Sequence, residues 1–263
     1  MCSTSLLPGV YFDKKHCESN DNQRANFGDT KKKFHGYVHG LNVVIKDEAQ
    51  AKEIYSVGNF GSFIGARMNF TNQKCFPRSN ISDGIGDGKR WLRCCTQNKW
   101  LYLSSLEALY LFGDLNVLKV EGYDSPEDFY KHIYKLSGWN LARKFIVYRY
   151  LQKLGWIVRD GISFGVDFLL YKGGVQLYHS SIGIRIVEPN ERLNDNCLLA
   201  LKRELSNCKK SLMLASVEMP DSAFNLSDFK SICSLEPELF MFNTWSWNKV
   251  RICDLDASNG DEE

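Results

Sequence analysis

The stretch Gly155–Val187, GWIVRDGISFGVDFLLYKGGVQLYHSSIGIRIV, decides the fold of this 263-residue chain. Short apolar runs alternate in it with turns that contain glycine, a pattern typical of successive β-strands. We expect strands at 156–159, 166–171, 175–179 and 183–187, with tight turns at Asp160-Gly161 and at Lys172–Gly174. The stretch therefore predicts a sheet in the C-terminal half of the chain.

Helical patterns flank this sheet. A long helix is predicted from Trp139 to Leu154, where Gly155 stops it, and a second from Asp195 to about Cys208, capped by Asn194 or Asp195. Strands follow at 211–217 and within 240–252. The C-terminal half thus reads as a mixed sheet with helices against it.

The preceding residues predict a smaller α/β domain. Strands are expected at 37–45, 100–103 and 117–120, and helices from Asp47 to a C-cap at Gly58, from the Ser104–Glu107 capping box, and from Ser125-Pro126 to about Leu136. We divide the chain into a flexible polar arm (1–35), an N-terminal α/β domain (36–138), a C-terminal domain (139–253) and an acidic tail (254–263).

Composition narrows the functional classes. Thirty-three Lys and Arg against 31 Asp and Glu leave a net charge of +2, too small for nucleic-acid binding by bulk charge, so any phosphate contact needs a local patch. Nine cysteines without a CxxC pair indicate ordinary thiols in a reduced compartment, and we expect neither a metal nor another cofactor. No apolar run approaches the roughly 20 residues of a membrane span. The glycine-containing run at 84–89 is followed by Arg90, which argues against a phosphate loop.

Three side chains could together cleave RNA, although each alone has an ordinary structural explanation. Attack by the RNA's own 2′-hydroxyl needs a base, an acid for the 5′-oxygen and a fixed cation for the phosphorane charge. Tyr171, His179 and Lys210 supply these groups, with the cation also helping tyrosine to act as a base. Seven residues lie between Tyr171 and His179, so the two can meet only if that segment leaves the strand ladder as a loop.

The quoted stretch resembles the catalytic core of the tRNA intron endonucleases. Gly155-Trp156, Arg159-Asp-Gly161 and Phe164-Gly-Val-Asp-Phe168 match that family's block in order, and WLYLSSLEALYLFGDLNVLKV, 100–120, resembles its N-terminal domain. The resemblance implies a restriction-endonuclease-like catalytic domain at 139–253. It also implies Tyr171 as base, His179 as acid and Lys210, rather than Lys209, as the transition-state cation, with a 2′,3′-cyclic phosphate and a 5′-hydroxyl as products.

Within that family, DFLLYKGG (167–174) and the preceding VYRYLQKLGW (147–156) resemble the eukaryotic catalytic subunit that cuts the 5′ splice site. The Tyr-Pro-Gly-Asp-Pro run of the other catalytic subunit is absent, and Val175 replaces a common proline. The resemblance further implies that Arg203 and Trp247, with Trp245 as the alternative, stack on a bulged intron base of precursor tRNA. It also implies a second catalytic subunit, two structural subunits, and a nuclear location, for which Lys31–Lys33 is a weak address.

Two alternatives stay open. The chain could be a non-catalytic structural or RNA-binding subunit of the same complex, although such subunits are expected to lack part of the Tyr-His-Lys set. It could instead be a metal-dependent nuclease that uses Asp167, although no Glu-x-Lys follows in 175–187.

Overall fold

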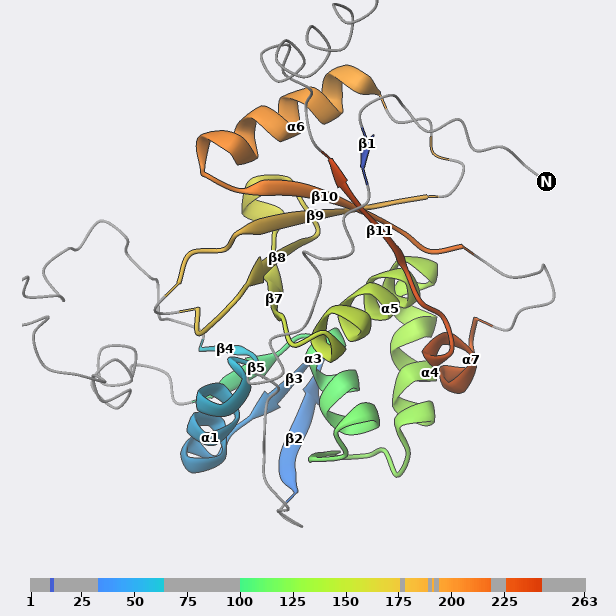
Figure 1. Cartoon of the computed structure of the whole chain (residues 1–263). Coiled ribbons are helices and arrows are strands. Elements are labelled where there is room, and N and C mark those ends of the chain that lie inside the picture. Colours follow the sequence, from blue (N-terminus) through green and yellow to red (C-terminus); the bar gives the residue numbers. More distant parts are fainter. Residues whose placement is uncertain are drawn as a thin grey trace, which may run out of the picture.

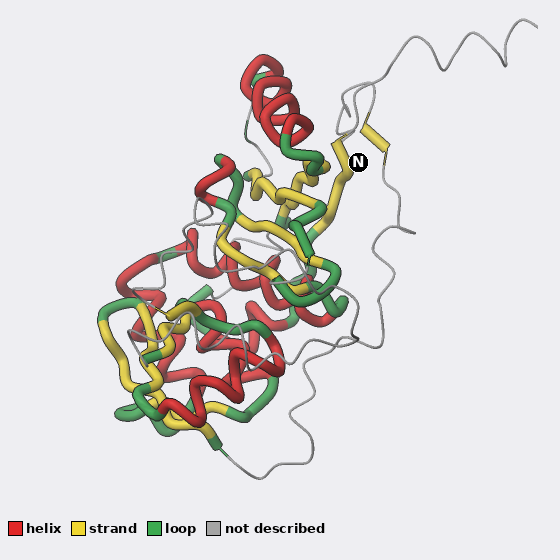
Figure 2. Tube along the Cα trace, turned by 90° about the vertical axis from the view of Figure 1, so that its left-hand side faces the viewer, coloured by secondary structure: helices red, strands yellow, loops and turns green. Residues whose placement is uncertain are grey.

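The computed structural model describes residues 10–11, 33–63, 100–175, 178–188, 191, 194–218 and 226–242. Its strands form two mixed sheets that occupy separate halves of the molecule, with helices around and between them (Figures 1 and 2). The predicted mixed α/β architecture is confirmed. None of the described helices is long and apolar enough to cross a lipid bilayer.

The C-terminal sheet has six strands. In spatial order they are β1 (Val10–Tyr11), β11 (Glu238–Phe242), β10 (Ser211–Ser216), β9 (Ile182–Val187), β8 (Phe168–Tyr171) and β7 (Ile157–Asp160). β9 and β10 pair in parallel, and all other neighbours are antiparallel. A long connection joins the parallel pair, and it contains the helix α6 (Asp195–Asn207).

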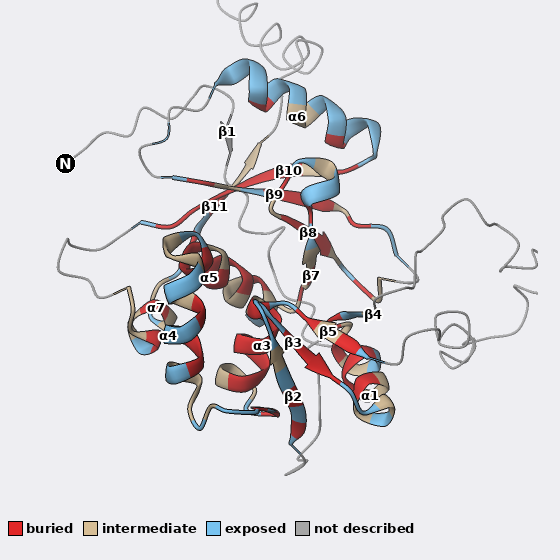
Figure 3. Ribbon diagram, turned by 180° about the vertical axis from the view of Figure 1, so that it is seen from behind, coloured by how far each residue is buried: buried red, intermediate tan, exposed pale blue. Residues whose placement is uncertain are grey.

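Helices cover both faces of this sheet because successive strand residues point to opposite sides. Phe168 and Leu170 join the main core on the side of α5 (Trp139–Lys153), whereas Leu169 belongs to a second cluster. That second cluster includes Leu198 and Leu205 of α6. Most other residues of α6 are exposed, as the pale ribbon in Figure 3 shows, so these few leucines hold it to the sheet.

The N-terminal sheet has five strands and its own helices. The spatial order is β4 (Ser62–Phe63), β5 (Leu101–Leu103), β3 (Asn42–Ile45), β2 (Phe34–His39) and β6 (Leu118–Val120), with β2 and β6 parallel. The helices are α1 (Glu48–Gly58), α3 (Ser105–Leu109), the π-helix η4 (Tyr110–Asp114) and α4 (Pro126–Ser137). Asp47 caps α1, and the predicted capping box of Ser104 and Glu107 opens α3.

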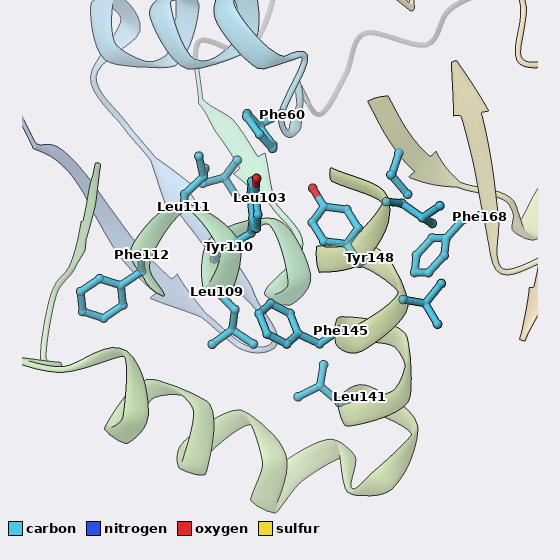
Figure 4. Packing of buried hydrophobic residues seen from close by; sticks show 14 of the residues in the cluster. Phe60, Leu103, Leu109, Tyr110, Leu111, Phe112, Leu141, Phe145, Tyr148 and Phe168 are labelled. Carbon is cyan, nitrogen blue, oxygen red and sulfur yellow. The ribbon is translucent and has the colours of Figure 1, made fainter. Parts of the chain in front are cut away.

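Helix α5 joins the two halves. Figure 4 shows its Tyr148 between Tyr110 of the N-terminal half and Phe168 of β8. The ring centroid of Tyr148 lies 6.1 Å from that of Tyr110 and 6.0 Å from that of Phe168. Arg159 of β7 adds a polar link, because its Nη1 donates to the carbonyl oxygen of Gly61 at 2.6 Å. One continuous core therefore serves both halves.

Several predictions need correction. The predicted strand 37–45 is a hairpin, because Gly40 turns the chain with φ +63° between β2 and β3. Helix α1 ends on Asn59, which takes the left-handed conformation that we assigned to Gly58. The predicted strand 175–179 does not form in its described residues. Two short helices, η5 (Ile162–Phe164) and α7 (Phe229–Cys233), complete the described elements.

Other predictions concern residues at or beyond the limits of the described ranges. Val10 and Tyr11 of the predicted polar arm form β1, which pairs with β11, and Phe34 already belongs to β2. The run at 84–89 and the acidic tail lie outside the described residues.

Candidate active site

Three neighbouring strands begin or end at one end of the C-terminal sheet. The N–H of Ser181 donates to the carbonyl oxygen of Leu170 at 2.9 Å, and the N–H of Ser211 donates to that of Ser181 at 2.9 Å. The second bond belongs to the register Ser211↔Ile182, whereas the first is offset by one residue from the register Leu170↔Ile182, where the ladder between β8 and β9 ends. Tyr171, Ser181 and Lys210 therefore lie at the same end of the sheet, where β8 ends and β9 and β10 begin.

Tyr171 and Lys210 also share a face of the sheet. Tyr171 lies two residues after Leu169, and Lys210 two residues before Leu212, and both leucines belong to the cluster under α6. Residues two apart in a strand point to the same side. The Tyr171 side chain packs against that cluster and remains partly exposed. The phenol and the ammonium are thus placed on the α6 side of the sheet.

The end of α6 fixes the position of Lys210. Lys209 adopts a left-handed conformation with φ +57°, and its N–H donates to the carbonyl oxygen of Ser206 at 2.9 Å. The N–H of Lys210 then donates to that of Leu205 at 2.8 Å. These two bonds form a Schellman motif, which stops the helix and turns the chain into β10. Lys209 remains exposed, whereas Lys210 points inward.

The ammonium of Lys210 is held by neutral groups. Its side chain is nearly buried, with 9% of the residue exposed, and Nζ donates to the carbonyl oxygen of Ser180 at 3.1 Å. Nζ also lies 5.1 Å from the centroid of the Phe164 ring. Among the described residues no carboxylate lies within ion-pair distance of it. A buried cation without a counter-charge is suited to meet an anion that arrives with a ligand.

His179 directly precedes the residue that Lys210 contacts. It is exposed, in the segment between β8 and β9. Tyr171 is the last residue of β8 and Ile182 the first of β9, so the intervening chain leaves the ladder as the spacing required. Lys210 is therefore buried beside the His179 segment rather than away from it.

Ser181 was missed by the sequence reasoning. Its backbone bonds to Leu170 of β8 and to Ser211 of β10, and its hydroxyl is buried without a hydrogen-bond partner among the described residues. Serine is too common in loops to attract notice, and only these backbone bonds reveal its position. An unpaired hydroxyl there could bind a phosphate or hydroxyl oxygen of a ligand.

Four other residues were candidates from the sequence: Arg203, Trp247, Trp245 and Asp167. Arg203 is exposed on α6, seven residues before Lys210. Trp247 and Trp245 lie outside the described residues. Asp167 lies at the other end of β8, where its carboxylate forms an ion pair with Lys144 at 3.0 Å and accepts from the N–H of Ile186 at 2.8 Å. The described residues contain no group of three or more His, Cys, Asp or Glu that could hold a metal ion.

The fold and site define a class: a mixed α/β protein in two halves, with a phenol and an ammonium on one face at one end of a sheet, beside an imidazole-bearing loop. Residues 34–131 match the sequence model of the tRNA intron endonuclease N-terminal domain, and residues 141–223 match that of the catalytic C-terminal domain. The chain belongs to the tRNA intron endonuclease family.

Named relatives agree with this placement. The tRNA-splicing endonuclease of Saccharolobus solfataricus is 33% identical over 135 residues, which are 49% of this chain and 72% of the relative. That of Methanothermobacter thermautotrophicus is 32% identical over 122 residues, 45% of this chain and 70% of the relative. The tRNA-splicing endonuclease subunit SEN2 of Eremothecium gossypii is 33% identical over 87 residues, which are 33% of this chain but 24% of that subunit.

Proposed function

We propose that this chain is a catalytic subunit of a tRNA-splicing endonuclease and cleaves precursor tRNA at an intron boundary, the 5′ splice site. The observation that carries the proposal is the ammonium of Lys210, buried without a carboxylate partner among the described residues, beside the His179 segment and on the same face of the sheet as Tyr171. Relatives named SEN2 subunits support the subunit type. The 5′ site rests on the resemblance of DFLLYKGG and VYRYLQKLGW, and on the absence of the other catalytic subunit's Tyr-Pro-Gly-Asp-Pro run.

The proposed chemistry is a transesterification without a metal. Tyr171 removes the proton of the 2′-hydroxyl, whose oxygen attacks the adjacent phosphorus. The bond from phosphorus to the 5′-oxygen breaks, and His179 donates a proton to that leaving oxygen. Lys210 stabilises the extra negative charge on the non-bridging oxygens. The products are a 2′,3′-cyclic phosphate and a 5′-hydroxyl.

The remaining parts of the proposal follow the family resemblance. Arg203 and Trp247 would stack on an unpaired intron base. A second catalytic subunit would make the other cut, two structural subunits would complete the complex, and the complex would work in the nucleus.

The test compares His179→Ala with His132→Ala, an exposed histidine on α4, each assembled with its partner subunits. The expected result is loss of the 5′ cut by about 10²- to 10⁴-fold for His179→Ala, the range of general acid catalysis, with the 3′ cut retained. His132→Ala should cut both sites, and the wild type should do so in chelator. Lys210→Met, which keeps the apolar stem, should behave like His179→Ala, with Lys209→Met as its control.

Each other outcome corrects a specific part. If both cuts survive every substitution, the chain is the non-catalytic subunit of the alternative reading. Loss of the 3′ cut alone would move the assignment to the other splice site. Loss of cleavage in chelator would favour metal-dependent chemistry.

A further inference from the structure

The outer face of the N-terminal sheet carries aromatic and basic side chains. In β2 the buried Phe34 and Gly36 alternate with the exposed His35 and Tyr37. The same alternation holds in β5 and β6. In β3, Val43 and Ile45 belong to the core cluster, whereas Val44, on the opposite side, is buried outside that cluster. The helices of this half share the core cluster with the inward residues, so the outward side is a separate surface.

Strand pairing places several side chains of this surface. His35 pairs with Lys119 across β2 and β6. The ladder between β2 and β3 ends at Tyr37↔Val44, and the N–H of His35 donates to the side-chain oxygen of Gln50 in α1 at 2.8 Å. On the other side of β3, the register Ile45↔Leu101 continues by one residue to place Lys46 opposite Trp100. Trp100, Lys46, His35 and Lys119 are all exposed.

Two tyrosines lie beside these residues on the same surface. Tyr37 and Tyr102 both pair with Val44, one from each side. Tyr37 is 38% exposed and Trp100 is 43% exposed, which is unusual for rings of this size. Nζ of Lys46 lies 4.2 Å from the centroid of the Tyr37 ring and 6.0 Å from that of Trp100. Both rings are therefore partly exposed, and Lys46 lies over the face of the Tyr37 ring.

The surface is mainly basic. Lys46 and Lys119 carry its positive charges, and within the bounds of β2, β3, β5 and β6 no outward position carries a carboxylate. Glu121 follows β6 at the edge of this surface, where its N–H donates to the carbonyl oxygen of Gly36 at 2.9 Å, and Asp47 is occupied in capping α1. Exposed aromatic rings among lysines match the two needs of an unpaired nucleic acid, which are stacking for bases and cations for phosphates.

We propose that this face is an RNA-binding platform on which two or three unpaired nucleotides stack against Trp100 and Tyr37, with phosphates bound by Lys46 and Lys119. Four-stranded sheets of other RNA-binding proteins use exposed aromatic side chains in this way for two or three bases. The platform lies in the half of the molecule that does not contain Tyr171, His179 or Lys210. Its RNA would be the substrate, so this identity rests on the proposed function, whereas binding itself does not.

The test measures binding of a fluorescein-labelled 12-nucleotide oligouridine by anisotropy. All proteins are the full chain with His179→Ala, so that the oligonucleotide stays intact. Trp100→Ala and Tyr37→Ala should each weaken Kd about 5- to 150-fold, which corresponds to 1–3 kcal/mol per stacked base. Trp100→Phe should keep most of the affinity. Lys46→Ala should lower the slope of log K against log salt by about 0.7, and Lys46→Arg should restore it.

Matched controls come from α4, which carries an exposed leucine, Leu136, and an exposed lysine, Lys135. Leu136→Ala and Lys135→Ala should bind as the parent does. The proposal is overturned if the parent does not bind, or if the ring variants bind as tightly as these controls. Ring variants that keep RNA affinity but no longer assemble with partner subunits would make the face a protein interface instead. If the platform variants weaken binding but the assembled wild type does not cleave precursor tRNA, the platform stands and the proposed function falls.

Discussion

Substituting Gly183 with alanine should disturb the packing of α6 on the sheet, and with it the position of Lys210. A Cβ on Gly183 would lie 3.1 Å from both δ-carbons of Leu205 and 3.4 Å from a γ-carbon of Val166. Non-bonded carbons prefer 3.5–4.0 Å. Leu205 is fully buried, so it cannot swing into solvent. The carbonyl of Leu205 accepts from the N–H of Lys210, so a shift of this turn reaches the candidate site.

The expected magnitude combines two opposing effects. Forcing an extra methyl into a packed core costs about 1–3 kcal/mol. Removing a glycine from a strand returns about 0.5–1 kcal/mol of chain entropy. Gly183→Ala should therefore lower the free energy of unfolding by about 0.5–2 kcal/mol. Leu205→Ala should lower it by about 2–5 kcal/mol through the cavity it leaves.

The decisive measurement is the double variant Gly183→Ala/Leu205→Ala in urea unfolding of the full chain. The new methyl would occupy part of the cavity, so the double variant should be at least about 1 kcal/mol more stable than the sum of the single effects predicts. Gly174→Ala is the control, because a Cβ there has nothing within 4 Å. Strict additivity, or a Gly183→Ala protein as stable as the wild type, would refute the reasoning.

Two further predictions concern the turn after α6 and a partly buried thiol. Lys209→Gly should raise the free energy of unfolding by about 1 kcal/mol, because the left-handed conformation strains any side chain. Lys209→Ala should not raise it. Equal effects of the two substitutions in urea unfolding would contradict this prediction. Burial raises the pKa of Cys233 from its ordinary 9.0 to about 11. At pH 8.5 iodoacetamide should therefore alkylate Cys233 more slowly than the exposed Cys197 and Cys208. Mass spectrometry follows the alkylation of each residue. The folded state binds this proton more tightly, so the contribution of the thiol to stability should be complete below pH 9, decline as the pH rises toward 11, and vanish in Cys233→Ala. Identical labelling rates, or an unchanged decline in Cys233→Ala, would count against the assigned burial.

Local signals in the sequence predict most helices of this fold. The capping box of Ser104 and Glu107 and the Ser125-Pro126 start were sufficient, because capping depends on residues within one turn. Strand ends were harder. The apolar run at 37–45 hides the turn at Gly40, and the run at 175–179 has strand-like composition but no strand in its described residues. Pairing partners decide these cases, and local composition does not reveal them.

In the candidate site, too, some features could be predicted from the sequence and others depend on strand pairing. Tyr171, His179 and Lys210 could be singled out by residue type and family resemblance, and their roles stay predictions. The position of Lys210 beside the His179 segment depends on the parallel pairing of β9 with β10, two strands joined through α6. No periodicity reports such a pairing, which is why Ser181 escaped notice. The exposed rings of Tyr37 and Trp100 were read only as strand residues, because exposure depends on which face the helices cover.

Helix α5 packs with one side against each of the two halves, and this determines how the molecule should unfold. Cutting the chain at Gly138 would leave Leu109 and its neighbours in one fragment, and Phe145 in the other, facing water instead of each other. Neither fragment would keep a complete apolar interior. In the intact chain, heat should therefore unfold both halves in a single cooperative step. What the family divides by name into two domains would then behave, in thermal terms, as one body.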